Sequence, residues 1–169
     1  MKQPRIGIIG LGYWGPNWLR NFAAFDGCTV AYACDRDAER IKKYERMYPS
    51  VRFTQDYEGL LKDETLDAVV IATPPETHAP LARLALDHGK HVLLEKPMTV
   101  TADDAADLTV LAQKKNLVLL IDHTFVFTGA VEKIAGLVRA GDIGDVLYLS
   151  LIHISEPTRL RRSRMPSSA

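Results

Sequence analysis

Three glycines near the start of the chain constrain its fold more than any other feature. Residues 5–10 (RIGIIG) predict a short buried strand, and residues 12–25 predict a helix. The glycines follow a G-x-G-x-x-G pattern across this junction: Gly10 permits a tight turn, Gly12 lets backbone approach a pyrophosphate, and Gly15 lets the helix pack on the strand. Pro16 suits the first helical turn, where its missing N–H is not needed. The pattern favours a dinucleotide-binding loop whose helix N-terminus faces the phosphates.

The alternation of strand and helix continues along the chain. Further apolar segments predict strands at 29–34, 51–54, 66–73, 91–96 and 117–122, and amphipathic segments predict helices at 37–48, 56–62, 76–88, 101–116 and 129–141. Gly89 is placed to end one helix, and Thr101 to cap another. Short strands that alternate with longer helices indicate right-handed β-α-β units. We expect an α/β Rossmann fold, a doubly wound parallel sheet, over 1–145, with residues 146–148 beginning a second domain.

Composition sets broad limits on function. The 169 residues are 47% hydrophobic and 25% charged, which is ordinary for a globular domain, and the formal net charge is zero. We therefore expect no nucleic-acid or membrane partner. No signal peptide and no apolar stretch of about 18 residues is visible, so a cytoplasmic location is expected. Cys28 and Cys34 fit no metal or redox spacing, so we expect reduced packing thiols and no metal site.

The last 21 residues differ in character from the rest. Residues 149–169 hold four arginines and one glutamate. One interpretation is a disordered basic extension, on a genuine short nucleotide-binding protein, that touches nucleic acid. However, 149–159 and 163–169 back-translate, in order, to two parts of a transposase-type sequencing adapter. We therefore expect this tail to be translated adapter and the chain to be truncated before its second domain. DNA sequence beyond codon 148 would decide between the two.

Asp35 ends the second strand, about 20 residues after Gly15, where an acid accepts hydrogen bonds from an adenosine ribose. Such a carboxylate favours NAD, because it would repel the 2′-phosphate of NADP. Arg36 could instead swing toward that phosphate, so NADP is the less favoured alternative. A capping role for Asp35 ahead of the next helix is the other interpretation.

The remaining loop residues are also candidates. Leu11 lies in the predicted phosphate loop with Tyr13 and Trp14. The aromatic side chains could flank the cofactor or pack against a neighbouring loop, and backbone N–H groups are the better candidates for phosphate contact.

Further candidates fall beyond the carboxyl ends of later strands, where open parallel sheets bind ligands. Thr73 and Pro74 can run extended beside a cofactor, and His78 follows in the first helical turn, where it could equally be a partly exposed helix residue. Glu95 and Lys96 close the fifth strand, and Asp122 and His123 the sixth. A lysine here could orient a substrate hydroxyl or accept its proton. A surface ion pair between Glu95 and Lys96 is the alternative.

The stretches IGIIGLGYWGPN, AVVIATPPETH and GKHVLLEKPM together resemble the Gfo/Idh/MocA oxidoreductases, named for glucose–fructose oxidoreductase and inositol dehydrogenase. The resemblance spans residues 4–148 and implies an NAD(P)-dependent oxidation or reduction of a sugar hydroxyl. It implies that the three glycines bind pyrophosphate and Asp35 the adenosine ribose. Thr73, Pro74 and His78 would line the cofactor, and Glu95 would bind the nicotinamide ribose. Lys96 would be the catalytic lysine, and His123 would lie near nicotinamide and substrate.

The stretches GYWGPNWLRNF and DHTFVFTGAV resemble more narrowly the members that act on UDP-activated N-acetylated sugars at C3. Family members are about twice as long, with an α/β open-sheet second domain that supplies the substrate pocket, a dimer interface and further acid–base residues. The resemblance therefore implies a homo-oligomeric parent enzyme with a sugar or UDP-sugar substrate, and a fragment that is inactive alone. A non-enzymatic regulator that senses dinucleotides on the same fold is the alternative.

Overall fold

The computed structural model describes residues 3–148. The tail that we expect to be adapter, 149–169, lies outside these described residues. The chain divides into two compact units, Met1–His123 and Thr124–Ala169. The domain boundary expected at residue 145 stays a prediction.

The first unit is built on a six-stranded sheet in the order β3-β2-β1-β4-β5-β6, with every neighbouring pair parallel. The order reverses between β1 and β4, and ligands of doubly wound sheets bind beside such a reversal. The predicted Rossmann topology is confirmed. The strands are β1 Arg5–Ile9, β2 Thr29–Cys34, β3 Arg52–Thr54, β4 Ala68–Ile71, β5 His91–Leu94 and β6 Leu119–Ile121.

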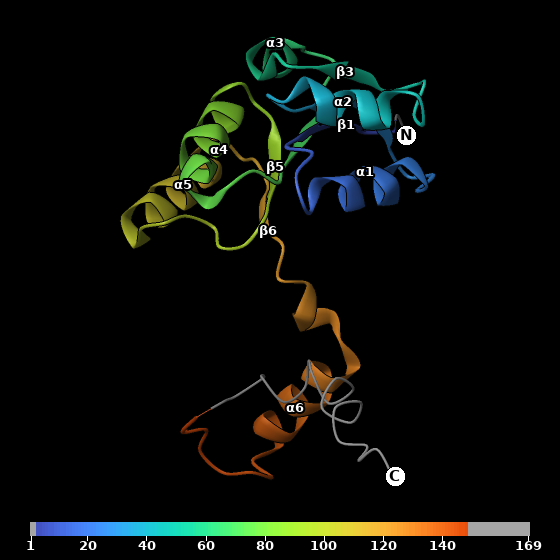
Figure 1. Cartoon of the computed structure of the whole chain (residues 1–169). Helices are drawn as coiled ribbons and strands as arrows, with labels where there is room; N and C mark the ends of the chain where they lie inside the picture. The colour runs from blue at the N-terminus through green and yellow to red at the C-terminus, as the bar shows by residue number, and fades with distance from the viewer. Residues whose placement is uncertain (1–2, 149–169) are drawn as a thin grey trace, which may run out of the picture. The chain divides into compact units, whose positions relative to one another are not determined.

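Helices cover both faces of this sheet (Figure 1). Leu19 and Ile41 bury one face of the sheet beneath α1 and α2. Leu61, Leu86 and Leu108 belong to a second buried cluster, which joins α3, α4 and α5 to the sheet. Helix bounds are α1 Gly15–Ala23, α2 Ala38–Glu45, α3 Tyr57–Lys62, α4 His78–Asp87 and α5 Ala102–Lys114, with a 3₁₀ turn η1 at Pro75–Thr77.

The capping residues explain where several helices begin and end. The Thr101 hydroxyl accepts a hydrogen bond from the Asp104 N–H, as expected of an N-cap, and Gly89 follows α4 with φ +73°. The helix predicted over 12–25 is shorter, because residues 11–14 form the turn that leads into α1. Asp37 caps α2 through the Glu39 N–H, so the capping interpretation of Asp35 is wrong.

The second unit, as far as it is described, contains a 3₁₀ turn η2 at Thr124–Phe127 and α6 at Gly129–Ala140. Gly141 ends α6 in the left-handed conformation with φ +77°, as a C-terminal glycine commonly does. The helix was predicted from its apolar periodicity, whereas the preceding turn was not.

Two further expectations concern the two cysteines and membrane-spanning helices. Cys28 and Cys34 are both free thiols, and burial raises the pKa of Cys34 to about 12. Within residues 3–148, no helix is both long enough and apolar enough to cross a membrane.

Candidate functional site

The register of the sheet aligns the carboxyl ends of five strands. Ile9 pairs with both Cys34 and Ile71, Ile71 pairs with Leu94, and Leu94 pairs with Ile121. The residues that follow each strand therefore share one edge of the sheet: Gly10, Asp35, Ala72, Glu95 and Asp122. This edge holds the candidate site.

Two glycines of the loop are required by the backbone itself. Gly10 has φ +99°, and a Cβ there would lie 2.6 Å from the Ala72 carbonyl oxygen. A Cβ on Gly15 would overlap the Gly10 carbonyl oxygen, so only glycine lets α1 approach β1 this closely. Gly12 differs, because its Cβ would meet only the Arg40 guanidinium, at 3.4 Å. Its missing side chain thus leaves backbone open to a ligand rather than relieving a clash.

The N-terminus of α1 is left open for an anion. Its N-cap, Trp14, makes no side-chain capping hydrogen bond, and no acidic residue lies in its first turn. By contrast Asp37, Asp56 and Thr101 cap α2, α3 and α5. Uncapped N–H groups and the positive end of the helix dipole together suit a phosphate. The loop and helix therefore fit a dinucleotide pyrophosphate.

The aromatic pair of the loop lies on its outer side. Tyr13 is 93% exposed, and its ring stacks on that of Trp14 with centroids 6.1 Å apart. Tyr13 thus does not pack against a neighbouring loop, and its contact with a cofactor stays a prediction.

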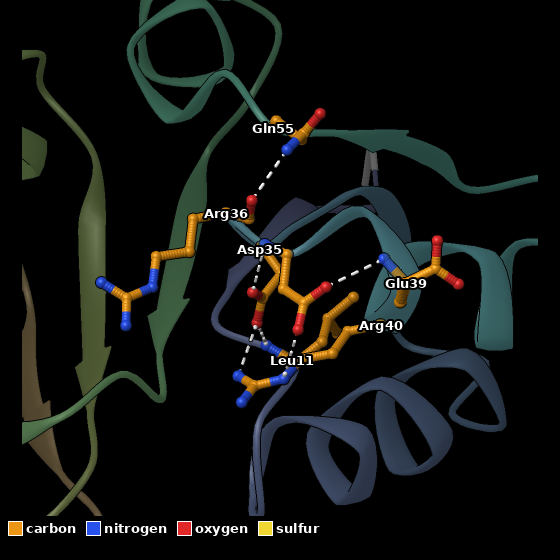
Figure 2. A network of polar contacts seen from close by, with 7 residues as sticks. Leu11, Asp35, Arg36, Glu39, Arg40 and Gln55 are labelled. Carbon is orange, nitrogen blue, oxygen red and sulfur yellow. Dashed lines mark hydrogen bonds and ion pairs between the residues drawn. The ribbon is translucent and has the colours of Figure 1, made fainter.

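Asp35 is the centre of a polar network (Figure 2). Its buried carboxylate accepts hydrogen bonds from the Leu11 N–H at 2.7 Å and the Asp37 N–H at 2.9 Å, and pairs with the Arg40 guanidinium at 3.4 Å. The Leu11 N–H therefore has a partner within the protein, and this hydrogen bond ties the glycine loop to the end of β2. Figure 2 shows the Arg36 side chain pointing away from this carboxylate, while its carbonyl accepts from the Gln55 side chain at 2.7 Å.

His78 joins the loops that follow β4 and β5. Its Nε2 lies 2.8 Å from the Thr73 carbonyl oxygen, and its Nδ1 lies 2.8 Å from the Pro97 carbonyl oxygen. The side chain is 1% exposed, so the interpretation as a partly exposed helix residue is wrong. Thr73 is half-buried and Pro74 is exposed at the same edge. His78 thus holds the Thr73 loop to the segment that carries Lys96.

Glu95 is buried and contacts α1. The indole N–H of Trp18 donates to Glu95 Oε1 at 2.9 Å, so the interpretation of Glu95 as part of a surface ion pair is wrong. Burial raises the pKa of Glu95 above its ordinary value. The Trp18 hydrogen bond opposes this rise, while the nearby charge of Asp122 reinforces it. Lys96 and His123 are exposed at the same edge, where they can reach a ligand.

The sequence alone assigns no role to two residues of this site, Trp18 and Asp122. Trp18 reaches Glu95 across 77 positions of sequence, and no local pattern signals that contact. Asp122 was recognised as a strand-end acid, but its pairing with Glu95 depends on the register of β5 and β6. Residues 3–148 contain no group of three or more His, Cys, Asp or Glu side chains that could hold a metal ion.

Together the sheet order, the glycine loop and the open helix N-terminus define an NAD(P)-binding Rossmann domain. Residues 4–123 match the Gfo/Idh/MocA model, described as an oxidoreductase family with an NAD-binding Rossmann fold, and the chain belongs to this family.

Relatives of the chain include sugar-nucleotide oxidoreductases. The dTDP-3,4-didehydro-2,6-dideoxy-alpha-D-glucose 3-reductase of Streptomyces violaceoruber is 46% identical over 151 residues, covering 89% of this chain and 44% of the relative. The 1-carboxy-3-chloro-3,4-dihydroxycyclohexa-1,5-diene dehydrogenase of Comamonas testosteroni is 30% identical, covering 90% of this chain and 38% of the relative. The chain therefore spans about two fifths of the length of these curated relatives.

Solved oxidoreductase structures superpose on this chain. A 3-ketoreductase from Actinomadura kijaniata, solved with NADP and TDP-benzene, superposes with a TM-score of 0.75 at 28% identity, over 85% of this chain and 44% of the other. The scyllo-inositol dehydrogenase of Lactobacillus casei, with bound NAD(H) and scyllo-inositol, gives a TM-score of 0.78 at 25% identity, over 85% of this chain and 43% of the other. Both cofactors thus occur among the structural neighbours.

Proposed function

We propose that this chain is the cofactor-binding part of an oxidoreductase that transfers hydride between NAD(P) and a hydroxyl of a nucleotide-activated sugar. The observation that carries the proposal is the shared edge, which places the open phosphate loop on the same side of the sheet as Glu95 and Lys96. A dinucleotide that lies along this edge can reach from the loop to the lysine. Relatives named as 3-reductases of dTDP-sugars support C3 as the reacting position.

Each part of the edge has a distinct task in this proposal. The N–H groups of Gly12 and Tyr13 bind the pyrophosphate, with the α1 dipole adding to the attraction. Bound NAD(P) supplies the carbon that accepts or gives the hydride. The exposed Lys96 ammonium orients the sugar hydroxyl and takes part in moving its proton. The contact between His78 and the Pro97 carbonyl fixes the segment that carries Lys96.

We propose NAD rather than NADP as the preferred cofactor. The negative charge of Asp35 at the end of β2 disfavours a 2′-phosphate, although its oxygens already accept three protein donors. Arg36 is exposed, and its positive charge is the feature that would favour NADP over NAD. Competition between the two cofactors on the isolated chain tests this choice.

The finer substrate proposal is a UDP-activated N-acetylated sugar. It rests on GYWGPNWLRNF and DHTFVFTGAV, while the relatives support only a nucleotide-activated sugar. We further propose that the parent protein is a homo-oligomer located in the cytoplasm. The chain alone is proposed to bind cofactor without turnover, since it matches about two fifths of each relative.

Calorimetric titration of the chain with NAD tests the core of this proposal. Wild type should bind, and Gly12→Val should weaken binding at least about tenfold, because the new side chain fills the path of the pyrophosphate. Gly136→Val is the matched control, since a Cβ at Gly136 meets open space on α6. Absence of NAD binding by the wild type, or equal binding by Gly12→Val, contradicts the proposal.

An intact protein that contains this chain separates the enzyme from the dinucleotide-sensing regulator. The enzyme should reduce NAD when given UDP- or dTDP-sugars, and Lys96→Ala should lower turnover more than it weakens NAD binding. NAD binding with no turnover on any nucleotide sugar favours the regulator.

A further inference from the structure

Glu95 and Asp122 bring two carboxyl groups together at the candidate site. Leu94 and Ile121 are partners in the parallel ladder, so the residues that follow them lie side by side and face the same way. The Asp122 N–H donates to the Leu94 carbonyl at 2.9 Å, which fixes this alignment. Glu95 and Asp122 are each 8% exposed, so two acidic side chains lie buried at adjacent positions on neighbouring strands.

Two buried carboxyl groups at adjacent positions favour the retention of one proton between them. Ionised carboxylates only accept hydrogen bonds, so two carboxyl groups can be bonded to each other only when one is protonated. Two negative charges at adjacent buried positions oppose double ionisation, and burial with the nearby charge of Asp122 raises the pKa of Glu95. A pair of this kind can hold one shared proton.

The groups next to this pair come from α1 and from the residues that follow β5 and β6. From α1 the facing group is the neutral indole of Trp18, whose N–H occupies Glu95 Oε1. The exposed Lys96 and His123 side chains are the charged neighbours of the pair along the chain. Trp18 thus holds Glu95 in one orientation, and α1 links the pair to the phosphate loop.

We propose that Glu95 and Asp122 share one proton in the free protein and release it to solvent when the cationic nicotinamide of NAD binds. This proposal rests on the proposed function, which places nicotinamide beside Lys96. A positive charge near a carboxyl pair favours its doubly ionised form, whereas the neutral ring of NADH gives no such attraction. Proton release by the pair then distinguishes the oxidised cofactor from the reduced one.

Calorimetry in two buffers that differ in protonation enthalpy measures the released protons directly. NAD should release between about 0.3 and 1 proton per molecule bound near the pH where the pair titrates, and NADH close to none. Asp122→Asn should abolish the release, because the amide can donate to an ionised Glu95. Exposed Glu64→Gln is the matched control and should behave as wild type. Equal proton release for NAD and NADH, or none for either, overturns the coupling.

Carbon-13 NMR of the side-chain carboxyls in the free chain tests the shared proton without any cofactor. Glu95 should titrate above the ordinary glutamate value of about 4.3, and Asp122→Asn should move it down. Titration of Glu95 in the ordinary range in the wild type overturns the shared proton. Failure of NAD to bind refutes the proposed function and the coupling together, whereas binding without proton release refutes the coupling alone.

Discussion

Replacement of Asp35 by alanine should loosen the glycine loop as well as weaken cofactor binding. The carboxylate accepts two backbone N–H groups, from Leu11 and Asp37, and Leu11 is only 1% exposed. Hydrogen bonds to a charged group contribute about 1.5–3 kcal/mol each, so the two together amount to roughly 3–6 kcal/mol. The Arg40 pair adds under about 1 kcal/mol, because the Arg40 side chain is 50% exposed.

Urea denaturation at neutral pH checks this value. Asp35→Ala should lower the free energy of unfolding by about 3–6 kcal/mol with an unchanged dependence on urea. Asp35→Asn should lose about half as much, since its amide oxygen can still accept one of the two N–H groups. The helix-cap variant Asp37→Ala, with an exposed side chain, should lose only about 1 kcal/mol. A loss for Asp35→Ala no larger than that of Asp37→Ala refutes the bracing role of Asp35.

Three further substitutions test other parts of the structure. Gly15→Ala should lower the free energy of unfolding by more than about 2 kcal/mol and remove NAD binding, because its Cβ overlaps the carbonyl of the preceding turn; unaltered binding by calorimetry contradicts this. His78→Ala should cost about 2–4 kcal/mol in urea denaturation, because it removes a ring N–H donor to the loop carbonyls together with a buried side chain, and a loss below about 1 kcal/mol refutes the link. Hydrogen bonds, chiefly from Thr65, lower the pKa of Asp63 to about 2. Its contribution to stability is therefore present above pH 3.8 and is lost as the pH falls from 3.8 through about 2. Asp63→Asn should therefore lose about 1 kcal/mol at neutral pH, after allowance for solvent screening, and show less acid destabilisation in denaturation curves; an unchanged acid slope contradicts this.

The sequence was enough to predict the fold because local signals agreed with one another. The glycine loop, the cap at Thr101 and the stop at Gly89 each mark an element boundary through backbone chemistry that any local stretch displays. Strand order then follows from right-handed crossovers of β-α-β units. The predicted elements differ from the observed ones mainly at their ends.

The contacts within the site could not be predicted in the same way. The Trp18–Glu95 hydrogen bond depends on where α1 packs against the sheet, and the adjacency of Glu95 and Asp122 depends on a register that no local pattern specifies. His78 looked like a surface residue of an amphipathic helix, yet two loop carbonyls hold it in the interior. The candidate residues were recognisable by type and position, whereas their partners required the tertiary structure.

A titration of the nitrogen-15-labelled chain with NAD, followed by amide NMR, tests the central claim most directly. Binding along the carboxyl edge should shift the amide signals of Gly12, Tyr13 and Lys96 together. The amide of Lys90, which precedes β5 at the opposite edge of the sheet, should stay in place. Shifts confined to the opposite edge, or no shift at saturating NAD, would contradict a dinucleotide site at this edge.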